Sequence, residues 1–364
     1  MPVEVFFRID ATAQTGGGHL ARCLVLASLL ARNGARTHFL CARLDGTYGE
    51  AIVRAGHGVE LLGVSPSPEP LAAIPDTVVA EDALACREAI RGRKGPRRLL
   101  VVDHYAIDAR WERMLRPELE RLMVIDDLAN RPHDCDLILD QAYGEDGARY
   151  KGLVPQHCAG LFGTQFALLR PEFAALRSRP LRDVWTAGVA LDVHVFFGSA
   201  DAHRNTLRFA PLLAGLDSVG TVQVAVSESF GAREELDQLA RRSNGRIRWC
   251  VPGPDMASHM AACDVAIGAP GQATWERACV GLPAAYLAIA DNQVAILQRL
   301  AAAGFCAYLG EGGDLDDGRL LRRIEDFLAD RRGLARLRAC SMAAVDGLGA
   351  DRVAQAFTAS AVLS

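Results

Sequence analysis

Short apolar runs alternate with longer amphipathic stretches along almost the whole chain. The apolar runs show little of the polar alternation that a half-exposed strand would have. This is typical of parallel sheets that are covered by helices on both faces. In the first half we predict strands over residues 3–9, 36–44, 59–64, 97–105, 121–128 and 135–142, with helices from residue 19 and over 48–55, 76–92 and 108–117.

The same alternation starts again after residue 190. The predicted strands cover residues 191–198, 221–227, 247–251, 264–269, 283–289 and 306–310, and the predicted helices start at 205 and 274 or cover 233–242, 255–263 and 293–303. Residues 316–362 have a helical pattern throughout. The two halves therefore share one architecture.

A charged segment with two prolines, residues 170–187, separates the two halves. We place the boundary there, which gives an N-terminal domain over 1–178 and a C-terminal domain with a helical tail over 188–364. The predicted fold class is α/β, with two doubly wound Rossmann-like domains that face a central cleft. Ligands of such sheets bind beyond the carboxyl ends of the strands, so functional residues should follow strands directly.

The composition of the chain limits the kinds of ligand and partner that we expect. The 364 residues carry a net charge of −4, which gives no basic field for nucleic acid. No apolar run approaches the roughly 20 residues that span a bilayer, and the start of the chain does not look like a signal peptide. The ten cysteines are scattered without a CxxC pair, which disfavours a zinc site. We expect a cytoplasmic protein without cofactor or metal and without an obligate protein partner.

The most informative segment joins the first strand to the first helix, at Gly16, Gly17, Gly18 and His19. Glycines allow positive φ and close approach of a ligand, and a helix N-terminus suits phosphate. The segment matches neither the dinucleotide nor the P-loop fingerprint. Because the positive end of the helix dipole disfavours imidazolium, His19 should be neutral at pH 7 and able to accept a proton. The alternative is a histidine that only caps or packs against the turn.

The chain resembles a known family in several segments that occur in the family's order. They are RIDATAQTGGGHLARCLVLA (8–27), VVDHYAID (101–108), VIDDLANRPHDCDLILDQAY (124–143), LVPQHCAGLFGTQFALLRPEF (153–173), VFFGSAD (195–201), GAPGQATWERACVGLP (268–283) and AIADNQ (288–293). They resemble the hydrolases that remove UDP from UDP-2,4-diacetamido-2,4,6-trideoxy-β-L-altropyranose in pseudaminic acid biosynthesis. That family is in turn similar to glycosyltransferases of the GT-B fold.

The resemblance implies metal-independent, inverting attack of water at the anomeric carbon of a UDP-sugar. The family's catalytic histidine corresponds to His19. One loop departs from the family pattern, because the chain has Gly198, Ser199, Ala200 and Asp201 where the family usually has two glycines, and Asn205 follows one residue late.

Several polar residues of the first half are candidates for the sugar site. Tyr105 ends an apolar strand and could hydrogen-bond the sugar or the attacking water. Asp103 is more readily explained as a structural residue that accepts backbone N–H groups in its turn. Arg8 and Asp10 favour an ion pair, although Asp10 could instead orient His19. The predicted substrate-binding set is Arg8, Asp10, Gly16, Gly17, Gly18, Tyr105, Asp127, Gln141 and Arg170.

A carboxylate pair and a histidine in the same half remain ambiguous. Asp134 and Asp136 match the D-x-D pattern of metal-dependent glycosyltransferases, but a lone match occurs often by chance, and we expect no metal there. Asp127 is expected to face the sugar instead. His133 could contact an acetamido group.

In the second half, the loop after strand 264–269 opens into a helix and offers a second anion site. Glu276 lies one turn into that helix and could accept two hydrogen bonds from ribose hydroxyls, or could only stabilise the helix N-terminus. GT-B enzymes that this sequence resembles use a glutamate at the matching place for ribose. The predicted UDP-binding set is Gly198, Asn205, Gly271, Gln272, Thr274, Glu276, Asn292 and Gln293.

Two other functions fit parts of the pattern. A GT-B glycosyltransferase would use the same donor with an acceptor in place of water, and the basic run 91–98 could then face a membrane. A sensor that binds a UDP-sugar without turnover would need no base at His19. Membrane binding and nucleic-acid binding are not expected.

Overall fold

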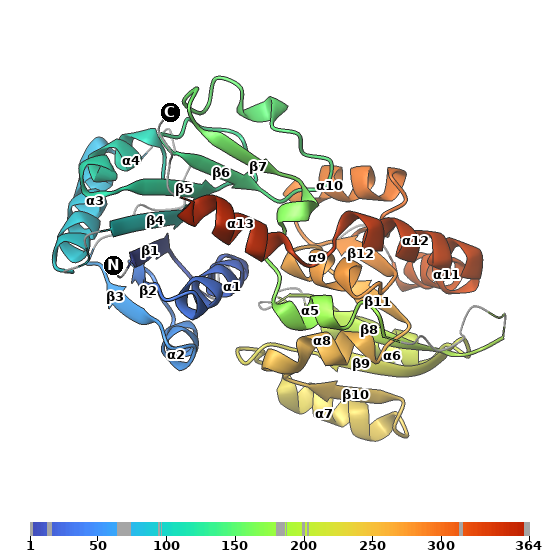
Figure 1. Ribbon diagram of the computed structural model, residues 1–364. Helices are drawn as coiled ribbons and strands as arrows, with labels where there is room; N and C mark the ends of the chain where they lie inside the picture. The colour runs from blue at the N-terminus through green and yellow to red at the C-terminus, as the bar shows by residue number, and fades with distance from the viewer. Residues whose placement is uncertain are drawn as a thin grey trace. The chain divides into compact units, whose positions relative to one another are not determined.

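The computed structural model describes residues 3–12, 17–63, 74–93, 95, 97–179, 186, 188–198, 201, 204–312 and 316–359. The chain forms two compact units (Figure 1). Unit 1 comprises Met1–Leu169 and Leu348–Ser364, and unit 2 comprises Arg170–Gly347.

Unit 1 contains a parallel seven-stranded sheet in the order β3-β2-β1-β4-β5-β6-β7. Its strands are β1 (Val3–Ile9), β2 (Arg36–Cys41), β3 (Gly58–Leu61), β4 (Arg97–Asp103), β5 (Arg121–Ile125), β6 (Leu137–Asp140) and β7 (Ala159–Phe162). Its helices are α1 (Gly18–Arg32), α2 (Gly46–Arg54), α3 (Asp76–Arg91), α4 (Ala109–Leu115) and α13 (Gly349–Thr358). The strand order reverses between β1 and β4, which is the switch point of a doubly wound sheet.

The two faces of this sheet bury separate cores. Successive strand residues point to opposite faces, so Phe7 packs in the core that includes α1 and α13, whereas Phe6 packs in the core that includes α3 and α4. Both side chains are fully buried. Figure 1 shows α1 and α13 together on one side of the sheet.

Unit 2 repeats this topology with a parallel six-stranded sheet in the order β10-β9-β8-β11-β12-β13. Its strands are β8 (Leu191–Phe196), β9 (Val219–Ala225), β10 (Ile247–Cys250), β11 (Val265–Gly268), β12 (Ala284–Ala288) and β13 (Ala307–Glu311). Its helices are α5 (Pro171–Ala175), α6 (Asn205–Ala214), α7 (Arg233–Arg242), α8 (Met256–Ala261), α9 (Gln272–Cys279), α10 (Asp291–Ala302), α11 (Asp317–Ala329) and α12 (Arg331–Ala344). The switch point lies between β8 and β11.

The division of the chain differs from the expected domains in two ways. Unit 2 starts at Arg170 rather than near residue 188, and the last helix, α13, belongs to unit 1 rather than to the C-terminal half. The apolar face of α13 explains its place, because Val353 and Phe357 are fully buried in the core of unit 1. Arg121 also donates hydrogen bonds to the carbonyls of Ala356 and Ala359, at 2.9 and 2.6 Å.

The predicted strands correspond to β1–β6 and β8–β13, within a few residues at their ends. Strand β7 was missed, because its four residues include Gly160 and only Leu161 is buried. Within the described residues, no helix combines the length and the apolar character needed to cross a membrane.

Candidate functional site

The switch point of unit 1 brings His19 and Asp103 together. Strands β1 and β4 are neighbours in the sheet, with Ile9 opposite Asp103, so α1 starts beside the carboxyl end of β4. His19 Nδ1 lies 2.6 Å from Asp103 Oδ1, and 12% of the His19 side chain is exposed. The site is therefore built from two elements that lie far apart in the sequence.

Arg22, one helical turn after His19, also contacts Asp103. Its Nε and Nη2 atoms donate to the two carboxylate oxygens, each at 2.6 Å. Although burial alone would raise the pKa of Asp103, Arg22 and His19 outweigh it and hold that pKa well below its ordinary value. Asp103 is consequently a carboxylate that has no proton to donate.

This geometry fixes the tautomer of His19. Because Asp103 can only accept, the proton of a neutral imidazole must lie on Nδ1 and point to Oδ1. Nε2 then keeps its lone pair and can accept a proton from a water molecule or hydroxyl. A base with this orientation is what general-base catalysis requires.

Tyr105 and Asp127 lie beside this pair. The Tyr105 ring meets the His19 ring edge-on, with 4.7 Å between centroids, and 43% of the residue is exposed. Burial and the neighbouring Asp127 raise the pKa of the Tyr105 phenol, which therefore keeps its proton and can donate it in a hydrogen bond. Arg22 Nη1 lies 3.3 Å from Asp127 Oδ2, and about a third of the Asp127 side chain is exposed (32%). Both predicted sugar-contacting groups thus lie close to the proposed base.

Three glycines precede His19 in the sequence. Gly16 lies outside the described residues. Gly17 precedes the first residue of α1, and a Cβ there would come within 3.3 Å of the Tyr48 ring. Gly18 begins α1 and has open space where a Cβ would lie. Gly17 has a negative φ of −90°, so no positive φ requires a glycine at this position.

Arg8 and Asp10 are engaged by protein groups in this structure, and their predicted contact with substrate stays a prediction. Arg8 is fully buried and donates to Asp82 Oδ2 and Asp10 Oδ1, each at 2.7 Å. Asp10 also accepts backbone N–H groups at Ala42 and Arg43, so it holds the end of β2 rather than His19. The expected ion pair is present, and Asp103 takes the orienting role that was considered for Asp10.

Gln141 and His133 are also structural. Gln141 is buried, and its Oε1 accepts the backbone N–H of Leu168 at 3.1 Å. His133 is buried against Glu112, with 2.7 Å between Nδ1 and Oε1. Both side chains are therefore held by protein groups, and their predicted contact with an acetamido group stays a prediction. Gln141 follows β6 directly and His133 precedes it by a short loop, so both lie near an end of this strand in the sequence.

The D-x-D carboxylates pair with an arginine. Arg116 Nη1 lies 2.6 Å from Asp136 Oδ2, which also accepts the backbone N–H of Leu122, and Arg116 Nε lies 3.7 Å from Asp134. These contacts account for both carboxylates without a metal ion.

In unit 2, the loops after β8 and β11 carry the predicted UDP residues. Gly271 has a φ of +145°, a conformation that favours glycine, and it directly precedes the first residue of α9. Thr274 is buried and its hydroxyl accepts the backbone N–H of Gly271 at 3.1 Å, so it caps the helix rather than facing a ligand. Gln272 opens α9 and is half-buried.

Glu276 lies one turn into α9 and is partly buried. Burial raises its pKa, against the opposing effect of Arg170 and Arg277. Arg170 was predicted to bind the sugar, but it belongs to unit 2, where its Nη1 donates to the carbonyl of Gly253 at 3.2 Å. It therefore lies with the predicted ribose ligand.

The segment after β8 carries two of the predicted UDP-binding residues, Gly198 and Asn205. Gly198 has a φ of +90° and open space around it. Asp201 caps α6, because its carboxylate accepts the backbone N–H groups of Asn205 and Thr206 at 2.9 and 2.8 Å. The backbone N–H of Asn205 is therefore already used, and the residue is buried, whereas its predicted contact with UDP stays a prediction.

At the start of α10, Asn292 is exposed, whereas Gln293 Oε1 accepts the backbone N–H of Ile289 at 2.9 Å. Asn292 thus remains available to a ligand, and Gln293 caps the preceding turn.

Sequence reasoning missed Arg22 and Arg277. Arg22 carried a signal, since residues three apart share a helix face and His19 was already a candidate. Arg277 is fully buried and donates to the carbonyl of Phe196 at 3.0 Å, which ties α9 to the end of β8. Nothing local to its sequence indicates this contact.

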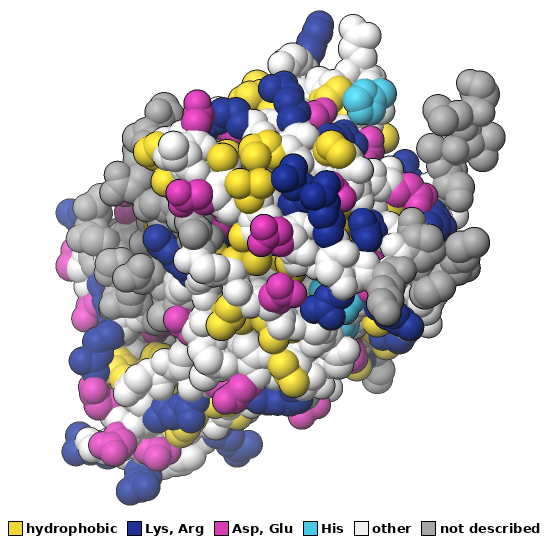
Figure 2. Space-filling model, turned by 90° about the vertical axis from the view of Figure 1, so that its left-hand side faces the viewer, with side chains coloured by type: hydrophobic (Ala, Val, Ile, Leu, Met, Phe, Trp, Pro, Cys, Tyr) yellow, Lys and Arg dark blue, Asp and Glu magenta, His cyan; other side chains and the backbone are white. Residues whose placement is uncertain are grey.

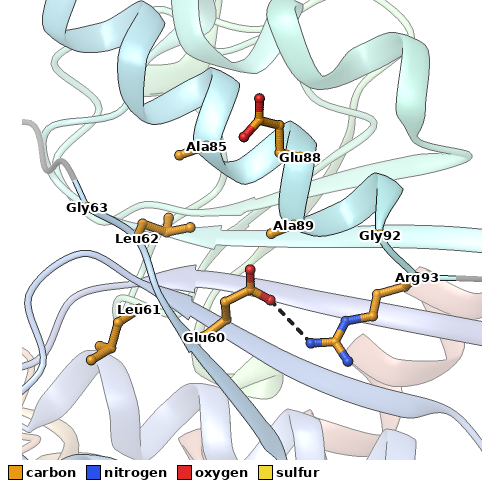
Figure 3. Close-up of a pocket in the computed structure, with 9 residues that line it drawn as sticks. All are labelled: Glu60, Leu61, Leu62, Gly63, Ala85, Glu88, Ala89, Gly92 and Arg93. Atoms are coloured by element: carbon orange, nitrogen blue, oxygen red, sulfur yellow. Dashed lines mark hydrogen bonds and ion pairs between the residues drawn. The ribbon is translucent and has the colours of Figure 1, made fainter.

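One groove lies apart from these residues. It measures about 490 Å³ and lies between the end of β3 and α3, where Glu60 contacts Arg93 at 3.2 Å (Figure 3). None of the predicted site residues lines it.

The two sheets and their shared strand order give the GT-B fold. Solved structures that resemble the chain include MurG from Acinetobacter baumannii, with a TM-score of 0.66, 14% identity and coverage of 98% of this chain and 99% of that one. Another is the spinosyn rhamnosyltransferase SpnG, with a TM-score of 0.64, 16% identity and coverage of 96% and 99%. These likenesses define the fold.

Similarity in sequence gives more specific information than similarity in fold. The chain is 25% identical over 260 residues to the UDP-2,4-diacetamido-2,4,6-trideoxy-β-L-altropyranose hydrolase of Campylobacter jejuni, a match that covers 71% of this chain and 81% of the relative. The resemblance predicted from the motifs is thereby confirmed. No protein-family model matches the chain.

Proposed function

We propose that the protein is a hydrolase that cleaves UDP from a UDP-2,4-diacetamido-2,4,6-trideoxyhexose of the altropyranose type. The observation that carries the proposal is the 2.6 Å contact between His19 Nδ1 and Asp103, which leaves Nε2 as a proton acceptor. The similarity to the hydrolase of Campylobacter jejuni supports this substrate class. Such a reaction belongs to nonulosonic acid biosynthesis.

In the proposed reaction, a water oxygen forms a bond to the anomeric carbon while its proton passes to His19 Nε2. The bond from that carbon to the diphosphate oxygen breaks, and UDP leaves with the electron pair and inversion at carbon. General-base assistance contributes roughly 100- to 10,000-fold, and positioning supplies the rest. No step needs a metal ion.

Residues of the two units have different roles in this proposal. In unit 1, the phenol of Tyr105 and the carboxylate of Asp127 are polar groups beside the base, and they would contact the sugar or the water. In unit 2, we assign UDP to the loops at Gly198 and Gly271 together with Gln272, Glu276 and Asn292. Arg170 would add positive charge beside Glu276.

The second function is a GT-B glycosyltransferase, which has the same fold and would use the same base. Its expected basic surface is not supported, because arginines of the run 91–98 pair with glutamates, as in Arg91 with Glu118 and Arg97 with Glu120, at 2.5 and 2.7 Å. Figure 2 shows basic and acidic side chains interspersed over one face of the molecule.

UDP release without an acceptor tests the proposal. The protein is incubated with UDP-2,4-diacetamido-2,4,6-trideoxyhexoses of several configurations in EDTA, and UDP and the free sugar are followed. We expect equal amounts of both, at a rate that EDTA leaves unchanged. Release that requires an added sugar or lipid acceptor would identify a glycosyltransferase, and binding without release would identify a sensor.

A further inference from the structure

Arg22 contacts the His19 ring and two carboxylates near it, those of Asp103 and Asp127. It donates twice to Asp103, its Nη1 lies 3.3 Å from Asp127, and its Nη2 lies 3.2 Å from His19 Nδ1. It is buried on α1. The 3.2 Å contact is not a hydrogen bond into the ring, because the proton on Nδ1 already points to Asp103.

Asp103 Oδ1 is therefore shared by two donors, His19 Nδ1 and Arg22 Nη2, each at 2.6 Å. A carboxylate that faced the imidazole alone would favour the imidazolium form, because an opposite charge at this distance stabilises it. A guanidinium on the same oxygen offsets that attraction. Arg22 also lies against the ring as a cation and so opposes a second positive charge there.

We propose that Arg22 is a positioning residue that sets the pH range in which His19 acts as a base, by holding the Asp103 carboxylate in a charge-balanced pair. This proposal rests on the proposed function, since it concerns the same histidine. In this arrangement Asp103 orients the ring, whereas the guanidinium of Arg22 balances the charge of the Asp103 carboxylate beside it.

The other charged and titratable groups around the ring follow from the packing. Arg22 comes from α1, and Asp103 comes from the end of β4. The loop after β4 contributes His104 and Tyr105. Asp127, after β5, acts through Arg22 and Tyr105. Arg22 therefore faces two carboxylates, and its removal would leave both uncompensated beside the ring.

The first test is the Arg22→Gln variant, with Arg22→Lys as the conservative exchange. Loss of the cation favours imidazolium, so the acid limb of kcat/KM moves to higher pH, by on the order of one pH unit, while the rate at the alkaline plateau recovers toward that of the parent. Arg22→Lys keeps the charge but not the bidentate geometry, so the midpoint of its acid limb should lie close to that of the parent. Arg32→Gln removes an exposed arginine from the same helix and serves as the matched control, with no shift expected.

A rate that falls equally at every pH in Arg22→Gln, with the acid limb in place, would show that Arg22 only supports the fold and would overturn the proposal. Asp127→Asn is a second variant, which keeps the proposal testable if Arg22→Gln does not fold. It should shift the acid limb in the opposite direction. It removes a negative charge beside Arg22, so the acid limb should move to lower pH. An unchanged limb in Asp127→Asn would also count against the proposal.

The same shifts can be read without turnover. The ring resonance of His19 in the free protein is titrated by NMR, assigned by its absence in His19→Asn. Its midpoint should rise in Arg22→Gln and return in Arg22→Lys. If the parent releases no UDP but the midpoint still moves, the proposed function fails and the role of Arg22 stands. If UDP is released but the midpoint does not move, only the role of Arg22 fails.

Discussion

At the scale of single residues, the proposed chemistry depends on the imidazole of His19 and on the carboxylate of Asp103, which lies 2.6 Å from its Nδ1. The sequence alone is enough to propose this histidine as a base, since a glycine turn that needs only phosphate binding has no use for one. Its partner could not be proposed in this way, because 84 residues separate His19 from Asp103. Asp103 looked like a turn residue that accepts backbone N–H groups.

Replacement of either residue should stop turnover with little effect on binding. His19→Asn removes the base, and we expect UDP-sugar affinity to remain while kcat falls about 100-fold or more. In Asp103→Asn, Arg22 takes the amide oxygen, so the amide N–H group points to Nδ1 and moves the ring proton to Nε2, with a similar loss of kcat. His157→Asn alters an exposed histidine and is the control. Steady-state kinetics and calorimetric UDP binding measure both effects, and a kcat within threefold of the parent in His19→Asn would exclude it as the base.

At the scale of elements, strand and helix positions follow from local periodicity, whereas the polar contacts between elements do not. Asp82 on α3 illustrates the second case. It is fully buried, accepts two hydrogen bonds from Arg8 on β1 and accepts a third from the Trp111 indole N–H at 2.7 Å. In the sequence, Asp82 is one acid among several on an amphipathic helix.

Asp82→Ala should destabilise unit 1 strongly. It leaves the Arg8 guanidinium buried with only Asp10 as a charged partner, and loss of one member of a buried ion pair costs about 3–5 kcal/mol. Glu81→Ala changes the neighbouring exposed acid on the same helix and should cost less than about 0.5 kcal/mol. Urea unfolding followed by circular dichroism gives both values. Equal midpoints in the two variants would show that the buried pair does not stabilise the fold.

At the scale of the whole molecule, the chain crosses from one unit to the other twice. The first crossing follows Leu169, and the second precedes Leu348, so α13 completes the unit in which the chain began. The helical pattern of residues 316–362 predicted helices correctly but could not show where they pack, because an apolar face fits any complementary surface.

Phe357→Ala tests this assignment. The side chain is fully buried in the core of unit 1, and its truncation should cost about 3–5 kcal/mol. Hydrogen exchange should accelerate in α1 and β1–β5 and stay unchanged in β8–β13. Gln355→Ala alters an exposed position on the same helix and should change neither. Faster exchange confined to unit 2 would place α13 with the other core.

The sequence by itself determined the two α/β halves and the fold class, because these depend on local periodicity and turn chemistry. It also singled out His19 as the candidate base, from a short motif at the start of the first helix. The tertiary structure decided which polar groups at the strand ends form hydrogen bonds or ion pairs within the protein. It paired His19 with Asp103 and Arg22, buried Arg8 and Gln141, turned Thr274 and Gln293 into caps, and returned α13 to unit 1. Each of these outcomes depends on which strands become neighbours, a long-range property that no single segment encodes.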